Sequence, residues 1–121
     1  MSAELIAVLL VEDDAAVRIG SEQALQLAGF PVRSFESAER VVPHIKPGMP
    51  AIVVSDVKLP GMDGLGLLRY VVDMERDLPV ILVTGHGDVT MAVKAMRTGA
   101  YDFIEKPFPS EHLVEVVGRA A

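Results

Sequence analysis

The sequence predicts an α/β protein, a three-layer sandwich in which a five-stranded parallel sheet lies between two layers of helices. Five short apolar runs, rich in β-branched residues, alternate with longer amphipathic stretches along the 121 residues. The runs are mostly continuous, as is typical of strands that are buried on both faces of a parallel sheet. Five strand–helix units in this length favour an open sheet with right-handed crossovers over a barrel, which needs about eight units and about 250 residues.

The apolar runs define the strands, and the stretches after them show helical spacing. The strands are predicted at residues 6–11, 32–35, 52–55, 80–84 and 101–104. The first helix is predicted at residues 15–28, because it ends at Gly29 and glycine commonly follows the last turn of a helix. The second helix follows Phe35 and starts near Glu36 or Ser37.

Capping residues set the bounds of the next two helices. Asp63 precedes the third helix, residues 64–74, and a carboxylate at this position accepts from free backbone N–H groups. Asp88 has the same place before the fourth helix, residues 89–97, which closes at Gly99. The side chains expected to face the core are Val17, Ala24, Leu25 and Ala28 in the first helix, Val41, Val42 and Ile45 in the second, Leu65, Leu68, Val71 and Val72 in the third, and Leu113, Val116 and Val117 in the fifth.

The fifth helix begins at Pro109 or Ser110 and runs toward the end of the chain. It reaches Ala121 without a clear stop signal beyond Gly118. We therefore expect residues 1–121 to form one domain of a longer protein.

Composition excludes several classes of function. A net charge of −6 at pH 7 disfavours direct binding to nucleic acid, which needs clustered Lys and Arg. The absence of Cys excludes disulfides, thiolate nucleophiles and Cys-ligated zinc. No apolar run approaches the roughly 20 residues that span a bilayer, and the N-terminus lacks a basic segment before an apolar one. These features predict a cytoplasmic protein without membrane contact.

Polar side chains follow four of the predicted strands, where ligands bind in open parallel sheets. They are Glu12, Asp13 and Asp14 after the first strand, Asp56 after the third, Thr84 at the end of the fourth, and Lys106 with Pro107 after the fifth. Taken singly, an Asp after a strand often caps the next helix, and a Lys-Pro pair often ends a strand.

Taken together, these side chains indicate an acidic metal site beside a phosphoryl-binding group. Carboxylates gathered at one sheet edge repel one another unless a cation neutralises them, and an all-oxygen site without Cys or paired His suits Mg²⁺. A lysine and a hydroxyl suit phosphoryl oxygens, and the central carboxylate can serve as nucleophile.

Four segments resemble the receiver domains of two-component response regulators, in the same order along the chain. They are residues 9–14 (LLVEDD), 55–64 (SDVKLPGMDG), 83–87 (VTGHG) and 103–108 (FIEKPF). The sequence is most similar to the nitrogen-regulator and C4-dicarboxylate-transport class, and also resembles nitrogen-fixation regulators with helix-turn-helix outputs. The resemblance implies a flavodoxin-like sheet with strand order 2-1-3-4-5.

The resemblance assigns a phosphorylation site and its metal ligands. Asp56 matches the phosphoacceptor, and Asp13 matches a direct Mg²⁺ ligand. Glu12 matches the other acidic residue, which often acts through water, and the backbone carbonyl of Lys58 matches a further ligand. The Lys58 side chain occupies a position that modulates the lifetime of the phosphoryl group, while Asp14 is left as a helix cap.

Further residues match the switch that reads the phosphoryl group. Thr84 matches the switch hydroxyl, Lys106 the lysine that pairs with the phosphoryl group, and Phe103 the switch aromatic. Plain core packing remains the alternative for Phe103. His86 lies at the rim of the site as a modulator, and Tyr101 is expected to be a surface aromatic of the output face.

The resemblance also implies partners. A sensor histidine kinase supplies the phosphoryl group, and the switched surface controls a C-terminal output, either a sigma-54-activating ATPase or a helix-turn-helix domain, or forms a homodimer on activation. A stand-alone relay protein is the alternative. The domain is expected to catalyse only its own phosphorylation and dephosphorylation.

Two competing classes fit the sequence less well. A Mg²⁺-dependent aspartyl phosphatase places its acid two residues after the nucleophile, where this chain has Lys58 after Asp56. A flavin carrier needs a Gly/Ser/Thr phosphate loop after the first strand, where this chain has Glu12 and Asp13.

Overall fold

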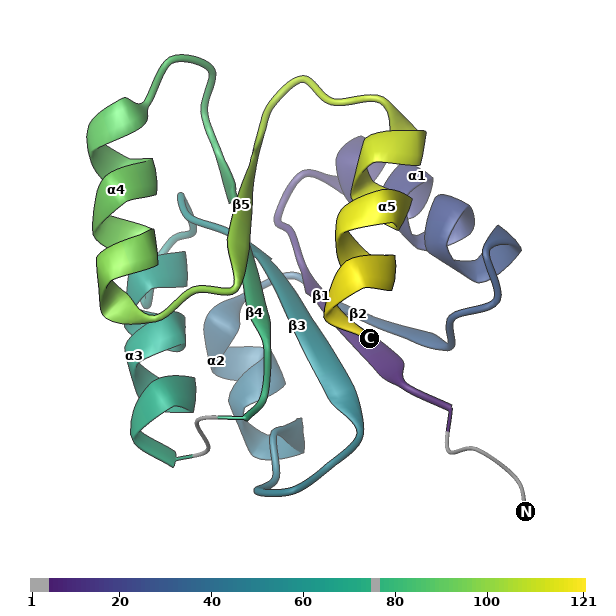
Figure 1. Ribbon diagram of the computed structural model, residues 1–121, viewed down its shortest axis with the longest axis horizontal. Helices are drawn as coiled ribbons and strands as arrows, with labels where there is room; N and C mark the ends of the chain where they lie inside the picture. Colours follow the sequence, from purple (N-terminus) through teal and green to yellow (C-terminus); the bar gives the residue numbers. More distant parts are fainter. Residues whose placement is uncertain (1–4, 75–76) are drawn as a thin grey trace.

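Five parallel strands form a single sheet in the computed structural model, which describes residues 5–74 and 77–121 (Figure 1). The strands are β1 (Ala7–Val11), β2 (Val32–Phe35), β3 (Ala51–Asp56), β4 (Val80–Thr84) and β5 (Asp102–Glu105). Their order in the sheet is β2-β1-β3-β4-β5, which confirms the order that the sequence resemblance implied. All four neighbouring pairs are parallel, so the carboxyl ends of the strands meet at one edge.

Helices cover both faces of this sheet. They are α1 (Ala15–Leu27), α2 (Ala38–Val41) with the short 3₁₀ helix η1 (Val42–His44), α3 (Gly64–Met74), α4 (Val89–Thr98) and α5 (Ser110–Ala120). In Figure 1, α2, α3 and α4 lie on one side of the strands, and α1 and α5 lie on the other. Within the two described ranges, no helix has the length and apolar character that crossing a membrane requires.

The core consists of two apolar clusters, one on each face of the sheet. Val53 of β3 packs in the cluster beneath α2, α3 and α4, while its neighbours Ile52 and Val54 pack in the cluster beneath α1 and α5. All six residues of β3 are buried, as expected for a central strand covered on both faces. Each fully buried aliphatic side chain contributes about 1.5–3 kcal/mol, and a shift of register by one residue would exchange the two faces. The register that aligns the strand ends is therefore strongly specified.

The second helix differs from its prediction. A single continuous helix was expected to carry Val41, Val42 and Ile45, but α2 is one turn that gives way to η1, and Ile45 follows η1. Pro43 explains the difference, because a proline lacks the N–H group that an α-helix interior requires. Ser37 caps α2 as predicted, with its Oγ accepting from Arg40 N at 3.2 Å.

Other boundaries differ by one residue. Strand β5 begins at Asp102 rather than Tyr101, and β1 begins at Ala7. Strand β3 extends one residue further at each end than predicted, so that it includes Asp56. In α1, the expected core residue Ala28 lies past the helix and is exposed.

The inward faces of the later helices agree with the prediction. Leu65, Leu68 and Val71 of α3 are buried, although Val72 is only half-buried and the unpredicted Leu67 is fully buried. The three apolar residues predicted to face inward from the fifth helix are buried in α5: Leu113, Val116 and Val117.

Candidate functional site

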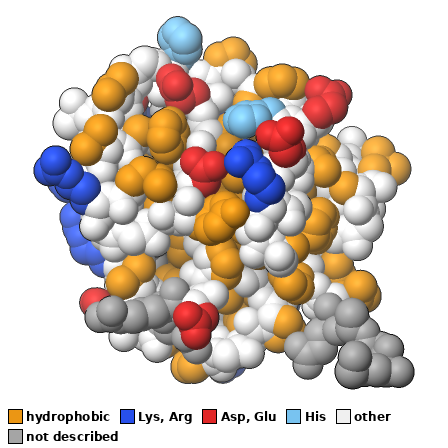
Figure 2. Space-filling model, viewed as in Figure 1, with side chains coloured by type: hydrophobic (Ala, Val, Ile, Leu, Met, Phe, Trp, Pro, Cys, Tyr) orange, Lys and Arg blue, Asp and Glu red, His pale blue; other side chains and the backbone are white. Residues whose placement is uncertain are grey.

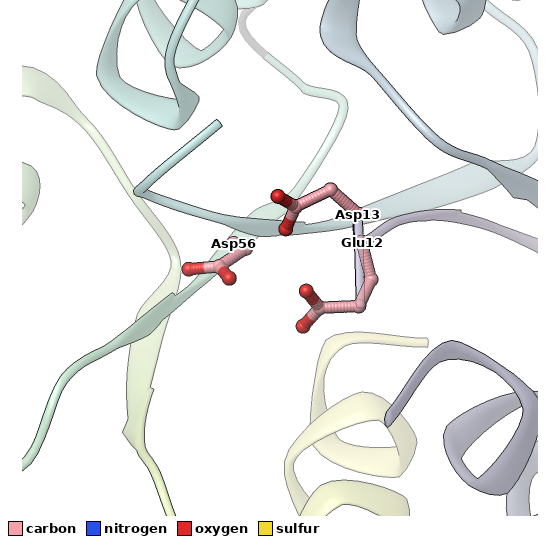
Figure 3. Close-up of side chains that lie close together, drawn as sticks. All are labelled: Glu12, Asp13 and Asp56. Carbon is pink, nitrogen blue, oxygen red and sulfur yellow. The ribbon is translucent and has the colours of Figure 1, made fainter. Parts of the chain in front are cut away.

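Three carboxylates gather at the carboxyl edge of the sheet. Glu12 and Asp13 directly follow β1, and Asp56 is the last residue of the neighbouring β3. Each offers an oxygen atom, and these oxygens lie within 4.8 Å of one another. Figure 3 shows the three side chains around one space, two from the end of β1 and one from the end of β3.

Asp56 is the central member of this group and is 8% exposed. Its Oδ2 accepts from Lys106 Nζ at 2.8 Å, and its Oδ1 accepts from Lys58 N at 3.2 Å. Lys106 follows β5, so the pair joins residues that are 50 positions apart. One carboxylate is thus held by an ammonium group and a backbone N–H while it remains next to two other acids.

Glu12 shares the same lysine. Its Oε1 lies 2.9 Å from Lys106 Nζ, and its Oε2 accepts from Asp14 N at 3.1 Å. Burial raises the pKa of the Glu12 carboxyl, the charge of Asp56 raises it further, and the hydrogen bond from Lys106 partly offsets both. Burial lowers the pKa of Lys106, but the hydrogen bonds to Asp56 and Glu12 and the negative charges of these two acids together outweigh burial and raise it. The lysine therefore stays charged between two acids.

The β1–α1 turn holds the acidic pair in place. Asp14 caps α1 as expected, with its Oδ1 accepting from Ala16 N at 2.9 Å and from Val17 N at 3.1 Å. Arg18 Nη1 donates to the backbone carbonyl of Glu12 at 2.8 Å. This role of Arg18 was not predicted, although a cation one turn into the helix after an acidic turn was an available signal.

The β3–α3 loop is packed closely against Asp56. Gly64 N donates to Val57 O at 2.9 Å, and a Cβ on Gly64 would contact the backbone carbonyl of Asp56 and lie 2.8 Å from Val57 Cα. Glycine is required here because the first turn of α3 touches the main chain of the acceptor. Asp63 caps α3 as predicted, with its Oδ1 accepting from Gly66 N at 2.8 Å.

A side chain of α2 also holds this loop. Glu39 Oε2 accepts from Met62 N at 2.7 Å, and this hydrogen bond lowers the pKa of the Glu39 carboxyl. Lys58 lies in the same loop with an exposed side chain. The contact with Glu39 was not predicted, because it depends on the path of the loop rather than on a sequence pattern.

Thr84 ends β4 next to this group and is 1% exposed. Within the part of the chain that the structure describes, its Oγ1 is buried without a hydrogen-bond partner. Its backbone carbonyl accepts from Lys106 N at 2.8 Å. A buried hydroxyl without a partner is costly, so Thr84 would gain from an acceptor brought to this edge.

The remaining predicted residues lie away from the carboxylates or at their rim. Phe103 of β5 is half-buried and lines a groove of about 410 Å³ against α4, together with Val93 and Met96. Tyr101 is 43% exposed just before β5, as expected of a surface aromatic. His86 is exposed in the β4–α4 loop.

The donor set fits a hard divalent cation. Glu12, Asp13 and Asp56 supply carboxylate oxygens alone, which Mg²⁺ prefers over nitrogen or sulfur ligands. Lys106 Nζ pairs with two of the three carboxylates, those of Glu12 and Asp56, so a group of three acids retains negative charge for a cation to offset. The acidic cluster is consistent with a metal site.

Comparisons with known proteins agree with this geometry. A model of the response regulator receiver domain family matches residues 8–118. The C4-dicarboxylate transport transcriptional regulatory protein DctD of Rhizobium meliloti (strain 1021) is 50% identical over 113 residues, which cover 93% of this chain and 25% of that protein. The transcriptional regulatory protein FixJ of Bradyrhizobium diazoefficiens is 40% identical over 114 residues, which cover 93% of this chain and 55% of that protein. The crystal structure of the receiver domain of NtrX from Brucella abortus matches with a TM-score of 0.87 at 37% identity, covering 93% of this chain and 96% of that one.

The chain belongs to the family of response regulator receiver domains, which are the phosphoacceptor signalling domains of two-component systems. The match confirms the resemblance that the sequence motifs indicated, including the similarity to DctD, NtrC and FixJ regulators. The flavodoxin-like fold is confirmed as well. The chain spans about a quarter of the length of DctD from Rhizobium meliloti and of DctD from Pseudomonas aeruginosa.

Proposed function

We propose that Asp56 accepts a phosphoryl group from the phosphohistidine of a sensor histidine kinase in the cytoplasm. The observation that carries this proposal is the position of Asp56, a carboxylate 8% exposed at the end of β3, 2.8 Å from Lys106 Nζ. Glu12 and Asp13 lie beside it with oxygens within 4.8 Å. This arrangement supports the proposal, because the Asp56 carboxylate has both an acidic pair and the positive charge of Lys106 beside it.

The residues that would hold Mg²⁺ are Asp13, Asp56, the backbone carbonyl of Lys58, and Glu12 through water. The ion, when bound, offsets the repulsion among these carboxylates and the charge on the transferring phosphoryl oxygens. Glu12 directs both of its oxygens to protein donors, Lys106 Nζ and Asp14 N. This engagement supports a water-mediated role for Glu12.

Asp56 then acts as the nucleophile. One carboxylate oxygen attacks phosphorus in line, so an O–P bond forms while the P–N bond to the kinase histidine breaks and its electron pair returns to the imidazole. Lys106, already 2.8 Å from Asp56 Oδ2, pairs with the phosphoryl oxygens. The acyl phosphate adds about two negative charges at this edge.

The side chains of Thr84 and Phe103 move in response to this added charge. The unpartnered hydroxyl of Thr84 gains an acceptor in the phosphoryl group, and Phe103 turns into the space that Thr84 leaves. The groove that Phe103 lines against α4 is thereby reshaped. Figure 2 shows hydrophobic side chains on the side of the molecule where α4 lies. Three apolar residues of α4, Val89, Val93 and Met96, are exposed. This shift between two states alters the α4–β5–α5 surface.

We infer that this surface controls a transcriptional output domain that follows residues 1–121 in a longer regulator. The relatives are named as transcriptional regulators, and the match covers only part of their length. A sigma-54-activating ATPase, a helix-turn-helix domain and an activated homodimer are the candidate outputs, with a single-domain relay as the alternative. Lys58 and His86, at the rim of the site, modulate the lifetime of the phosphoryl group.

Labelling with acetyl phosphate in the presence of Mg²⁺ tests the proposal. We expect one phosphoryl group per chain by intact mass, and none in Asp56→Asn or after chelation of the ion. Asp63→Asn is the matched control, because Asn also caps helices and Asp63 lies outside the cluster. Labelling of Asp56→Asn at the rate of the unsubstituted chain would overturn the proposal.

A further inference from the structure

A side chain outside the proposed machinery ties the β4–α4 loop to the sheet. Glu105, the last residue of β5, is exposed, and its Oε2 accepts from Gly87 N at 2.9 Å. The sheet register places Glu105 opposite Thr84. The tether therefore joins the loop that follows Thr84 to the residue that precedes Lys106.

Packing does little to fix the loop itself. A Cβ built on Gly85 or Gly87 would find nothing within 4 Å, so both glycines border open space. The backbone hydrogen bonds of the loop are local: Asp88 N donates to Gly85 O at 3.2 Å, and Val89 N donates to Gly87 O at 2.9 Å. These bonds shape the turn but do not anchor it to β5, whereas Glu105 does.

We propose that Glu105 is a positioning residue that holds the β4–α4 loop in its resting place and so lowers the affinity of the site for a phosphoryl group. The inference rests on the proposed function, in which the Thr84 hydroxyl moves toward phosphorylated Asp56. Because Gly85 follows Thr84 directly, that movement draws the loop along and separates Gly87 N from Glu105. The hydrogen bond is made in the resting state and lost in the activated state, so it biases the equilibrium between them.

The size of the effect follows from the kind of bond. An exposed hydrogen bond to a carboxylate shifts a two-state equilibrium by about two- to tenfold. The negative charge of Glu105 also lies one residue from Lys106, and removing that charge would by itself favour an anion at the site. A test must therefore separate the bond from the charge.

Two substitutions make this separation. Glu105→Ala removes both the acceptor and the charge, while Glu105→Gln removes the charge but keeps an amide oxygen that can accept from Gly87 N. Glu111→Ala is the matched control, because Glu111 is an exposed acid in the first turn of α5, away from the loop. Thermal unfolding midpoints establish that all three variants fold.

The measurement is the dissociation constant for beryllofluoride with Mg²⁺, by calorimetry, together with the amide resonance of Gly87. We expect Glu105→Ala to bind about two- to tenfold more tightly than Glu105→Gln, which reports the effect of the charge alone, and to shift the Gly87 amide, while Glu111→Ala matches the unsubstituted chain. If both Glu105→Ala and Glu105→Gln lowered the dissociation constant equally, or if neither lowered it, the proposal that Glu105 tethers the loop would be overturned. Failure of the unsubstituted chain to bind, or equal binding by Asp56→Asn, would instead overturn the proposed function and the tether with it.

Discussion

Lys106 is the residue on which the electrostatics of the site depend. Its Nζ lies 2.9 Å from Glu12 Oε1 and 2.8 Å from Asp56 Oδ2, so one positive charge serves two nearly buried acids. Removing the lysine would leave two buried acids without a compensating charge, and that loss costs more than the pairing itself contributes. The site therefore depends on Lys106 more than on either acid, and the phosphoryl group that we propose on Asp56 would enter a contact that already exists.

Replacing Glu12 by Gln should raise the free energy of unfolding at pH 7 without added metal, because burial penalises the ionised Glu12 carboxyl in the folded chain. A carboxyl whose pKa is raised on folding contributes stability that is present below its ordinary value of 4.5 and is lost as pH rises above it. The advantage of the variant should therefore shrink as pH falls toward 4.5. Urea unfolding between pH 4.5 and 8 measures it, and an advantage that grew on acidification would contradict this account.

At the scale of single elements, the first turn of α3 determines how closely a helix approaches Asp56. Gly64 touches the main chain of Asp56 and Val57, where a Cβ would have to displace backbone. Gly20, by contrast, lies inside α1 with nothing within 4 Å of its Cβ position. Gly64 and Gly20 thus offer a matched comparison of a required and a dispensable helical glycine.

Gly64→Ala should lower the free energy of unfolding by about 1–3 kcal/mol, as overpacking does, and should slow phosphorylation because the Asp56 backbone must shift. Gly20→Ala should raise it by about 0.5–1 kcal/mol, because alanine loses less backbone entropy in a helix. Denaturant unfolding and acetyl phosphate labelling measure both effects. Equal free energies of unfolding for the two variants would show that the close approach of α3 to Asp56 does not affect stability.

Elements with a strong periodic pattern and a capping residue were predictable from the sequence. Both bounds of α3 and β4 agree with the structure, because apolar spacing and side-chain caps are local properties. The break at Pro43 was missed, since the apolar spacing continued past a residue that an α-helix interior excludes. Boundaries such as that of β5 differ because a strand begins where its hydrogen-bonded pairing begins, and pairing is not local.

In the site, too, features set by local sequence patterns were predictable, and those that depend on the path of the chain were not. The convergence of Glu12, Asp13, Asp56 and Lys106 was predictable, because polar residues that follow parallel strands meet at one edge. Contacts made by the turns were not predictable, because each depends on a loop path that no periodicity encodes. They include the hydrogen bonds from Met62 N to Glu39 and from Gly87 N to Glu105.

At the scale of the whole molecule, the sheet connects the acidic edge to the α4 groove. Thr84 and Phe103 lie on the neighbouring strands β4 and β5, and Leu82 pairs with Phe103 in their register. One end of these strands meets the carboxylates, while Phe103 lines the groove against α4. The charge that we propose at Asp56 would therefore reach the α4 surface through two neighbouring strands.

The central claim is that Asp56 forms the acyl phosphate, and the most direct test is to find the modified residue. The chain is phosphorylated with acetyl phosphate and Mg²⁺, the acyl phosphate is reduced with sodium borohydride, and the digest is sequenced by mass spectrometry. The account predicts homoserine at position 56 and unchanged aspartate at position 13. Homoserine at position 13, or a phosphoryl group that resists reduction because it sits on a histidine or a hydroxyl, would contradict it.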